Sequence, residues 1–122
     1  MEKPIIVCYG ISDYDYERLN KLCLKFKFDI KKAELTEYSL PIAAQVSGVS
    51  PILPYLGEGL PEVMLVFANF PEGTLDLFLS EMRKHKIAIG SLKAILTQYN
   101  AAWTPIQLYK ELCREREAFS HK

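Results

Sequence analysis

The sequence predicts an α/β fold in which a strand–helix–strand–helix unit occurs twice and forms one four-stranded sheet with helices. Two observations lead to this prediction. A short apolar run closed by a turn occurs near the start of each half, at 5–9 and at 62–68, and such runs are typical of strands covered on both faces. The string Lys-Ala-x-Leu-Thr also occurs twice, at 32–36 and at 93–97, which indicates an internal duplication.

The first unit is expected over 4–47. Gly10 closes its apolar strand, and Ser12 can cap the following helix because its hydroxyl accepts hydrogen bonds from the first free backbone amides. Asp15 lies at the positive end of this helix and favours it. Apolar residues then recur at helical spacing as far as Phe26, so one face of the helix should pack on the sheet.

The rest of the first unit has a less regular pattern. Alternation over 30–35 predicts a second strand with one exposed face or edge. A short helix is expected over 40–46, with Pro41 in its first turn, where a missing N–H costs nothing.

The connector 48–61 holds three prolines and three glycines, so we expect no regular structure in it. Ile52, Leu53, Tyr55 and Leu56 make it too apolar for a free linker. These side chains are therefore expected to lie against the core.

The second unit is expected over 62–119. After its apolar strand, a helix should bury a face that includes Leu75 and Leu79, and a second strand should cover 87–96 with a bend near Gly90. A further helix should begin at Thr104, which is followed by proline and, three residues after the cap, by glutamine.

Two sheets fit this pattern, and both place the apolar strands in the centre. A parallel sheet in the order 2-1-3-4 would bring the turns at Gly10 and Asn69 together in a crevice. A ferredoxin-like antiparallel α+β sandwich in the order 4-1-3-2 is the alternative. In either case the chain is expected to form one domain over 1–122.

The charge balance excludes some classes of partner. Fifteen basic and fifteen acidic residues give a net charge of zero, whereas nucleic-acid binders usually show a basic surplus, so no nucleic acid is expected. No apolar run approaches the about 18 residues of a membrane span, and no signal peptide is evident, so we expect a cytoplasmic protein without a membrane partner. Nucleic-acid binding would need one face to carry Lys21, Lys25, Lys27, Lys31 and Lys32.

A candidate ligand site lies in the loop before the last helix. Lys93, Thr97, Asn100, Trp103 and Thr104 would place ammonium, hydroxyl and amide groups beside a tryptophan at a helix N-terminus, where a small anionic or polar ligand could bind. The alternative is structural: Asn100 holds a turn, Thr104 caps the helix and Trp103 fills the edge of the core.

No catalytic set is evident. The three cysteines are odd in number and lack metal-binding spacing, so they fit buried reduced thiols. Cys8 lies inside a central strand, and His85 lies at a helix end among lysines, so neither indicates a nucleophile and its base. With two histidines in the chain, we expect no metal site, and no motif indicates another cofactor.

The second half resembles a known family. Residues Val63 to Phe119, with the string Leu92-Lys93-Ala94-Ile95-Leu96-Thr97, then Asn100 and Trp103, resemble a bacterial domain of roughly sixty residues whose function is unknown. The resemblance therefore implies no activity. The first half has Ser39 where the second has Asn100 and has no tryptophan, so a site built on those residues would exist once.

We therefore expect a non-catalytic binding or regulatory module of unknown function that acts through protein–protein contact or a small polar ligand. Exposed edge strands offer unpaired backbone groups and predict a possible homodimer. The alternative is a small cytosolic enzyme with its site in the loop 97–104.

Overall fold

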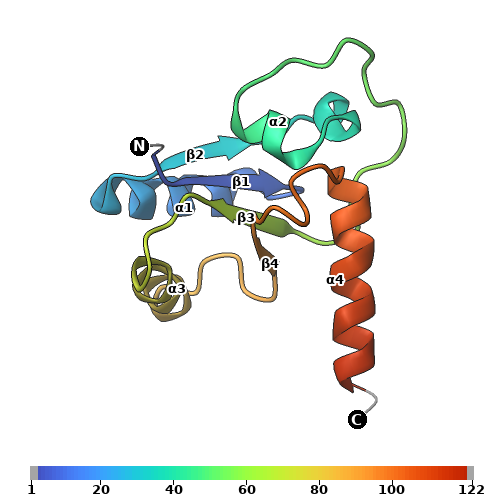
Figure 1. The fold of residues 1–122 in the computed structure, drawn as a ribbon. Helices are drawn as coiled ribbons and strands as arrows, with labels where there is room; N and C mark the ends of the chain where they lie inside the picture. The colour runs from blue at the N-terminus through green and yellow to red at the C-terminus, as the bar shows by residue number, and fades with distance from the viewer. Residues whose placement is uncertain (1–2, 121–122) are drawn as a thin grey trace.

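The computed structural model describes residues 3–120 and confirms an α/β fold built on one four-stranded mixed sheet (Figure 1). Strands and helices alternate along the chain in the predicted order, with a 3-10 helix added after the second strand. In chain order the elements are β1 (Ile5–Tyr9), α1 (Asp13–Phe26), β2 (Asp29–Lys32), the 3-10 helix η1 (Leu35–Ser39), α2 (Ile42–Val46), β3 (Met64–Ala68), α3 (Thr74–Lys84), β4 (Leu92–Ile95) and α4 (Pro105–Ser120).

The sheet has the order β2-β1-β3-β4, with a parallel pair at each edge and an antiparallel pair in the centre. The predicted order 2-1-3-4 is confirmed, but the fully parallel sheet and the ferredoxin-like order are both wrong. Because Tyr9 pairs with Met64 and Ile5 with Ala68, the strands β1 and β3 end at opposite ends of the sheet. The crevice expected between the turns that follow these two strands therefore does not form.

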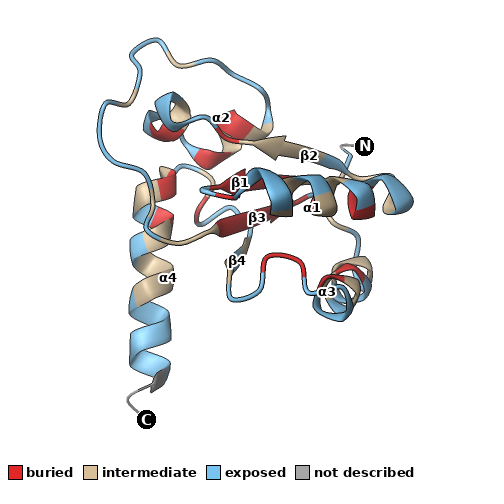
Figure 2. Cartoon of the chain, turned by 180° about the vertical axis from the view of Figure 1, so that it is seen from behind, coloured by how far each residue is buried: buried red, intermediate tan, exposed pale blue. Residues whose placement is uncertain are grey.

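Helices cover both faces of the sheet (Figure 2). Ile6 and Cys8 of β1 face a core shared with α1 and α3, whereas Val7 and Tyr9 face a core shared with η1, α2 and α4. Every residue of β3 is buried as well. Burial on both sides explains why the two central strands read as continuous apolar runs.

The two Lys-Ala-x-Leu-Thr strings do not occupy equivalent positions. The central strands meet at Val7 and Val66. Cys8 and Phe67 follow these two residues and therefore hold equivalent positions in β1 and β3. The carbonyl of Cys8 accepts from the amide of Ala33, and the carbonyl of Phe67 accepts from the amide of Leu96. Ala33 thus corresponds in the sheet to Leu96 and not to Ala94, its match in the string. The duplication predicted from the strings is therefore not confirmed.

Both second strands are shorter than predicted. The strand expected over 30–35 ends at Lys32, because Glu37 accepts a hydrogen bond from the amide of Glu34 at 2.8 Å and the chain turns into η1. Of the second strand expected over 87–96, only Leu92–Ile95 forms. The segment before it is a turn in which Ile87 is buried.

The connector 48–61 is irregular as predicted, but most of its apolar side chains do not reach the core. Of the four residues expected at the core, only Tyr55 packs against it: its ring stacks on Tyr38 with centroids 5.9 Å apart, and its amide donates to the carbonyl of Thr36 at 2.9 Å. The expectation is wrong for the other three, since exposed fractions of 97%, 77% and 91% are found for Ile52, Leu53 and Leu56.

Helix α4 crosses the sheet and continues past the edge formed by β4 (Figure 1). Leu108 in its first half is buried in the core, whereas the residues from Arg114 to Phe119 are exposed. The second half of α4 therefore overhangs the open edge of the sheet. No helix within residues 3–120 is long and apolar enough to cross a membrane.

Candidate functional site

A cleft of about 490 Å³ wraps around the open edge of β4, and we call it the edge cleft. One wall comes from α3 through Leu75 and Leu79, and the other from α4 through Leu108 and Leu112. The strand itself forms the floor. The position where a fifth strand would lie is thus bordered by apolar side chains from both layers of helices.

In β4, the backbone N–H and C=O groups of every second residue point away from β3 and toward this cleft. The amides of Leu92 and Leu96 donate to the carbonyls of Val63 and Phe67, so even-numbered residues bond to β3. Since neighbouring residues of a strand point their backbone groups in opposite directions, Lys93 and Ile95 direct theirs outward. These are the groups through which a sheet edge pairs with another chain.

Asn100 ends the open edge. Its side-chain Nδ2 donates to the carbonyl of Ile95 at 3.0 Å, and its Oδ1 accepts from the amide of Thr97 at 2.9 Å. The residue is 9% exposed. Both amide atoms therefore bond to the turn that Asn100 belongs to, as the structural alternative proposed.

The two threonines of the predicted site also serve the local backbone. The hydroxyl of Thr97 accepts from the amide of Tyr99 at 3.2 Å. Thr104 forms a reciprocal cap with Gln107: its hydroxyl accepts from the Gln107 amide at 3.3 Å, and Gln107 Oε1 accepts from the Thr104 amide at 2.9 Å. The helix start predicted from Thr104 and Gln107 is thus confirmed.

Trp103 joins the loop to the first half of the chain. Its carbonyl accepts from the amide of Ile42 at 2.9 Å, and the carbonyl of Ala101 accepts from the amide of Ala43 at 3.1 Å. These bonds satisfy two of the free amides at the start of α2. The indole packs at the margin of the core on the α4 side and lines the edge cleft.

Lys93 is the only one of the five predicted site residues that has a charged side chain. Its side chain lines the cleft, and its ammonium donates to the carbonyl of Ser91 at 3.1 Å. Partial burial, with a smaller effect of nearby Arg83, lowers the pKa of Lys93. On the opposite wall, Glu111 and Glu115 of α4 add negative charge.

Four of the five predicted site residues therefore line one cleft: Lys93, Thr97, Asn100 and Trp103. Thr104 is not among its lining residues. Sequence reasoning missed the walls, because Leu75, Leu79 and Leu112 lie at helical spacings that indicate core positions. They are partly exposed because no further strand lies beside β4. A helical spacing in the sequence does not show that a neighbouring strand is missing.

The part of the chain described by the structure offers no reactive thiol in its core. Cys8 is fully buried, and burial, together with neighbouring Cys23, raises the pKa of its thiol. Burial also raises the pKa of Cys23, to about 12. Both thiols are therefore protonated at neutral pH and behave as small apolar side chains.

Comparison with known proteins bears on the second half of the chain. No curated protein and no solved structure matches the sequence. All residues that line the edge cleft fall between Phe67 and Glu115. This stretch lies within residues 63–119, from the start of β3 into α4, which match a family described as a domain of unknown function, DUF3783.

Proposed function

We propose that this protein is a non-catalytic binding module that takes up an extended segment of a partner protein as an additional strand on β4. One observation carries the proposal: the open edge of β4 forms the floor of an apolar cleft that α4 overhangs (Figure 1). Addition of a strand to an exposed sheet edge is a common mode of peptide recognition, in which backbone bonds supply affinity and side-chain pockets supply specificity.

The backbone of β4 supports this mode. The N–H and C=O of Lys93 and the N–H of Ile95 point away from β3. The C=O of Ile95 already accepts from Asn100. An added strand would therefore be bonded most strongly beside Lys93, and Asn100 would mark where the pairing ends.

The side chains around the cleft indicate the chemistry of the segment. Alternate residues of an added strand would point to opposite faces of the sheet. On one face they would meet Leu75 and Leu79, and on the other Trp103 and Leu112. The carboxylate of Glu115 on the α4 wall favours a basic residue at the margin of the segment. We expect an apolar, extended segment with at least one lysine or arginine.

A small polar ligand or an enzymatic site in the loop 97–104 is less well supported. Either would need polar groups free to contact a ligand. The side-chain amide of Asn100 bonds to Ile95 and Thr97, and Thr104 caps α4. These groups already serve the turn and the helix start.

A second copy of the chain is the other possible occupant of the edge, as the predicted homodimer requires. Pairing β4 with its symmetry mate about a two-fold axis normal to the sheet would place both α4 overhangs on the same face. Because α4 extends past β4 (Figure 1), the two overhangs would then compete for the space above the joined edges. This crowding favours an extended segment over a folded second copy.

The expected cellular setting belongs to the proposal as well. Cys8, Cys23 and Cys113 are free thiols in the structure, which is consistent with a reducing compartment such as the cytoplasm. A bacterial source is part of the same proposal and rests on the resemblance of Val63 to Phe119 to a bacterial domain.

The proposal can be tested with displayed random peptides of about six residues, the usual length of a strand. Trp103 is the only tryptophan of the chain and lines the cleft, so its fluorescence reports occupancy directly. Selected peptides should bind the wild type and Lys93→Ala but lose about tenfold or more in affinity for Lys93→Pro. Proline removes an outward N–H without breaking a bond to β3, and edge strands tolerate it.

Peptides that bind Lys93→Pro as well as they bind Lys93→Ala would contradict strand addition. Concentration-dependent self-association that changes Trp103 fluorescence and disappears in Lys93→Pro would instead identify a second copy as the occupant. Circular dichroism of both variants controls for folding.

A further inference from the structure

A second surface groove, of about 360 Å³, lies between α1 and the end of α3, apart from the edge cleft. Its lining residues are Arg18, Lys21, Leu22, Lys25, His85 and Ile87. Three are lysine or arginine, a fourth is histidine, and none is acidic. In a chain whose net charge is zero, this composition marks a local excess of positive charge.

Helical spacing explains why these residues gather. Arg18, Lys21 and Lys25 stand three and four positions apart along α1, so they lie on one side of the helix. Arg18 also fixes this side of α1 to the turn that follows α3, because its guanidinium donates to the carbonyl of His85 and, at 3.2 Å, to the carbonyl of Lys86. Arg18 thus links the two walls of the groove.

The positive charge of the groove is only partly neutralised. Asp15 lies 3.8 Å from the guanidinium of Arg18, and Glu81 lies 3.3 Å from the imidazole of His85. Within residues 3–120, no acidic side chain forms an ion pair with Lys21 or Lys25. Two ammonium groups of one helix face are therefore available to an anion.

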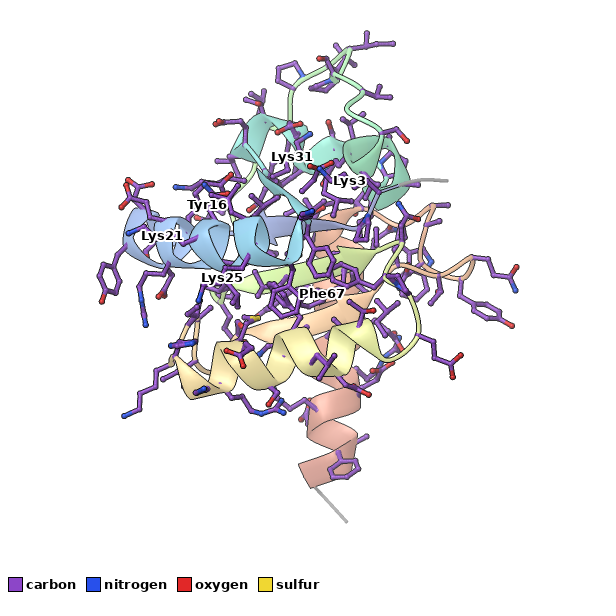
Figure 3. All side chains as sticks on the ribbon, turned by 90° about the vertical axis from the view of Figure 1, so that its left-hand side faces the viewer. Lys3, Tyr16, Lys21, Lys25, Lys31 and Phe67 are labelled. Carbon is purple, nitrogen blue, oxygen red and sulfur yellow. The ribbon has the colours of Figure 1, made fainter. Side chains whose placement is uncertain are left out.

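Other lysines of the same region do not extend this surface. Figure 3 shows Lys21 and Lys25 along α1, whereas Lys31 lies toward α2. There the ammonium of Lys31 bonds to Glu37 at 2.8 Å and to the carbonyl of Gln45 at 3.2 Å, and Lys32 is paired with Asp13. The ammonium groups of Lys31 and Lys32 are thus paired elsewhere and do not add to the positive charge beside Lys21 and Lys25. A small anion suits the groove better than a polyanion.

The floor of the groove is apolar. Leu22 and Ile87 are 5% and 6% exposed, and both belong to the core between the sheet and the helices α1 and α3. A ligand could therefore place an apolar group on this floor while its anionic group contacts the lysines. The volume lies within the range of small-ligand sites, about 300–1,000 Å³.

We propose that this groove binds a small phosphorylated compound that carries an apolar group, with Lys21 and Lys25 as ligands of the phosphate and Leu22 and Ile87 beneath the apolar part. Lysine acts on phosphate as a compact, mobile charge. Arg18 links the two walls and adds a further positive charge to the lining of the groove. The inference is independent of the strand addition proposed for β4.

Phenyl phosphate is a suitable probe, and its binding can be followed through the backbone amide signals in NMR spectra of the full chain. We expect saturable shifts that centre on Lys21, Lys25 and Ile87. Inorganic phosphate should bind about tenfold more weakly because it lacks the apolar group, and phenol should not bind because it lacks the charge. The variant Lys21→Gln/Lys25→Gln should lose at least about tenfold in affinity, since both substitutions are on the surface and remove only charge.

Lys110→Gln is the matched control, because Lys110 is an exposed lysine on α4, outside the groove. It should bind phenyl phosphate as the wild type does. Equal binding by the double variant, shifts spread over all lysines, or an absence of saturation would each overturn the proposal. Tighter binding of an oligonucleotide or of a polyglutamate peptide at the same residues would also overturn it, in favour of a macromolecular anion.

Discussion

Asn100 holds the end of the edge strand through Ile95, whose carbonyl accepts from the Asn100 side chain at 3.0 Å. The same side chain accepts from the amide of Thr97 at 2.9 Å, so one buried residue satisfies a backbone acceptor and a backbone donor. This arrangement ends β4 and turns the chain toward α4. It also sets the length of open edge that the edge cleft presents.

Replacing Asn100 by alanine should therefore destabilise the protein. The substitution removes two hydrogen bonds, each of which typically contributes about 0.5–1.5 kcal/mol to stability. Thermal unfolding should show a melting temperature several degrees lower, and amide exchange should be faster at Leu96 and Thr97. Gln98→Ala, an exposed neighbour in the same turn, is the control and should leave both unchanged. Equal melting temperatures for the two variants would show that the turn holds without Asn100.

The sequence identified the polar residues of the candidate site but left two roles open for them. Asn and Thr before a helix can hold turns and cap helices, or they can contact a ligand. The structure supports the structural role for Asn100 and Thr104. The apolar part could not be predicted. Leu79 and Leu112 lie far apart in the chain and become walls of one cleft only because β4 is an edge strand with α4 above it.

Tyr9 and Gln45 form a hydrogen-bonded pair inside the core on the α4 side, and both are fully buried. Tyr9→Phe should cost about 1–3 kcal/mol, because the Gln45 side-chain oxygen loses its donor. In a Gln45→Leu background the same substitution should cost less, with a coupling energy of about 0.5–3 kcal/mol. Urea unfolding of the four proteins measures this coupling. Strictly additive effects would mean that water or another group replaces the bond.

The fold was predictable where burial leaves a mark on the sequence. Apolar runs identified β1 and β3 as central, and cap residues identified the starts of α1 and α4. Strand direction leaves no such mark, because a central strand is buried on both faces whether its neighbour is parallel or antiparallel. The connector 48–61 is long enough for either case. The repeated strings predicted equivalent strands for a related reason. Similar residues form a strand in β4 but begin a 3-10 helix in η1.

Gly57 should be required for the anchored part of the connector. A methyl group at this position would overlap the ring of Tyr55 and lie 2.5 Å from its Cζ atom. The ring stacks on Tyr38, and its hydroxyl donates to the carbonyl of Glu58 at 3.0 Å, so Gly57→Ala should displace Tyr55. We expect a loss of about 1–2 kcal/mol and faster proteolysis within 48–61. Gly59→Ala is the matched control, because its methyl group would lie at an ordinary 3.6 Å from Leu35. Equal proteolysis rates for the two variants would contradict the anchoring role of Tyr55.

Glu62 should make the stability of the protein sensitive to acid. Arg116 bonds to both carboxylate oxygens at 2.9 Å, Tyr109 donates to one of them at 2.9 Å, and these bonds lower the pKa of Glu62 from 4.5 to about 2. Because the folded pKa lies below the unfolded value, this contribution is complete above pH 4.5 and is lost as the pH falls toward 2. The melting temperature of Glu62→Gln should therefore fall less steeply than that of the wild type over this interval. Glu58→Gln makes the same charge change at an exposed residue and should keep the wild-type slope. A parallel loss of stability in Glu62→Gln and the wild type would show that the bond to Arg116 does not secure α4 to the start of β3.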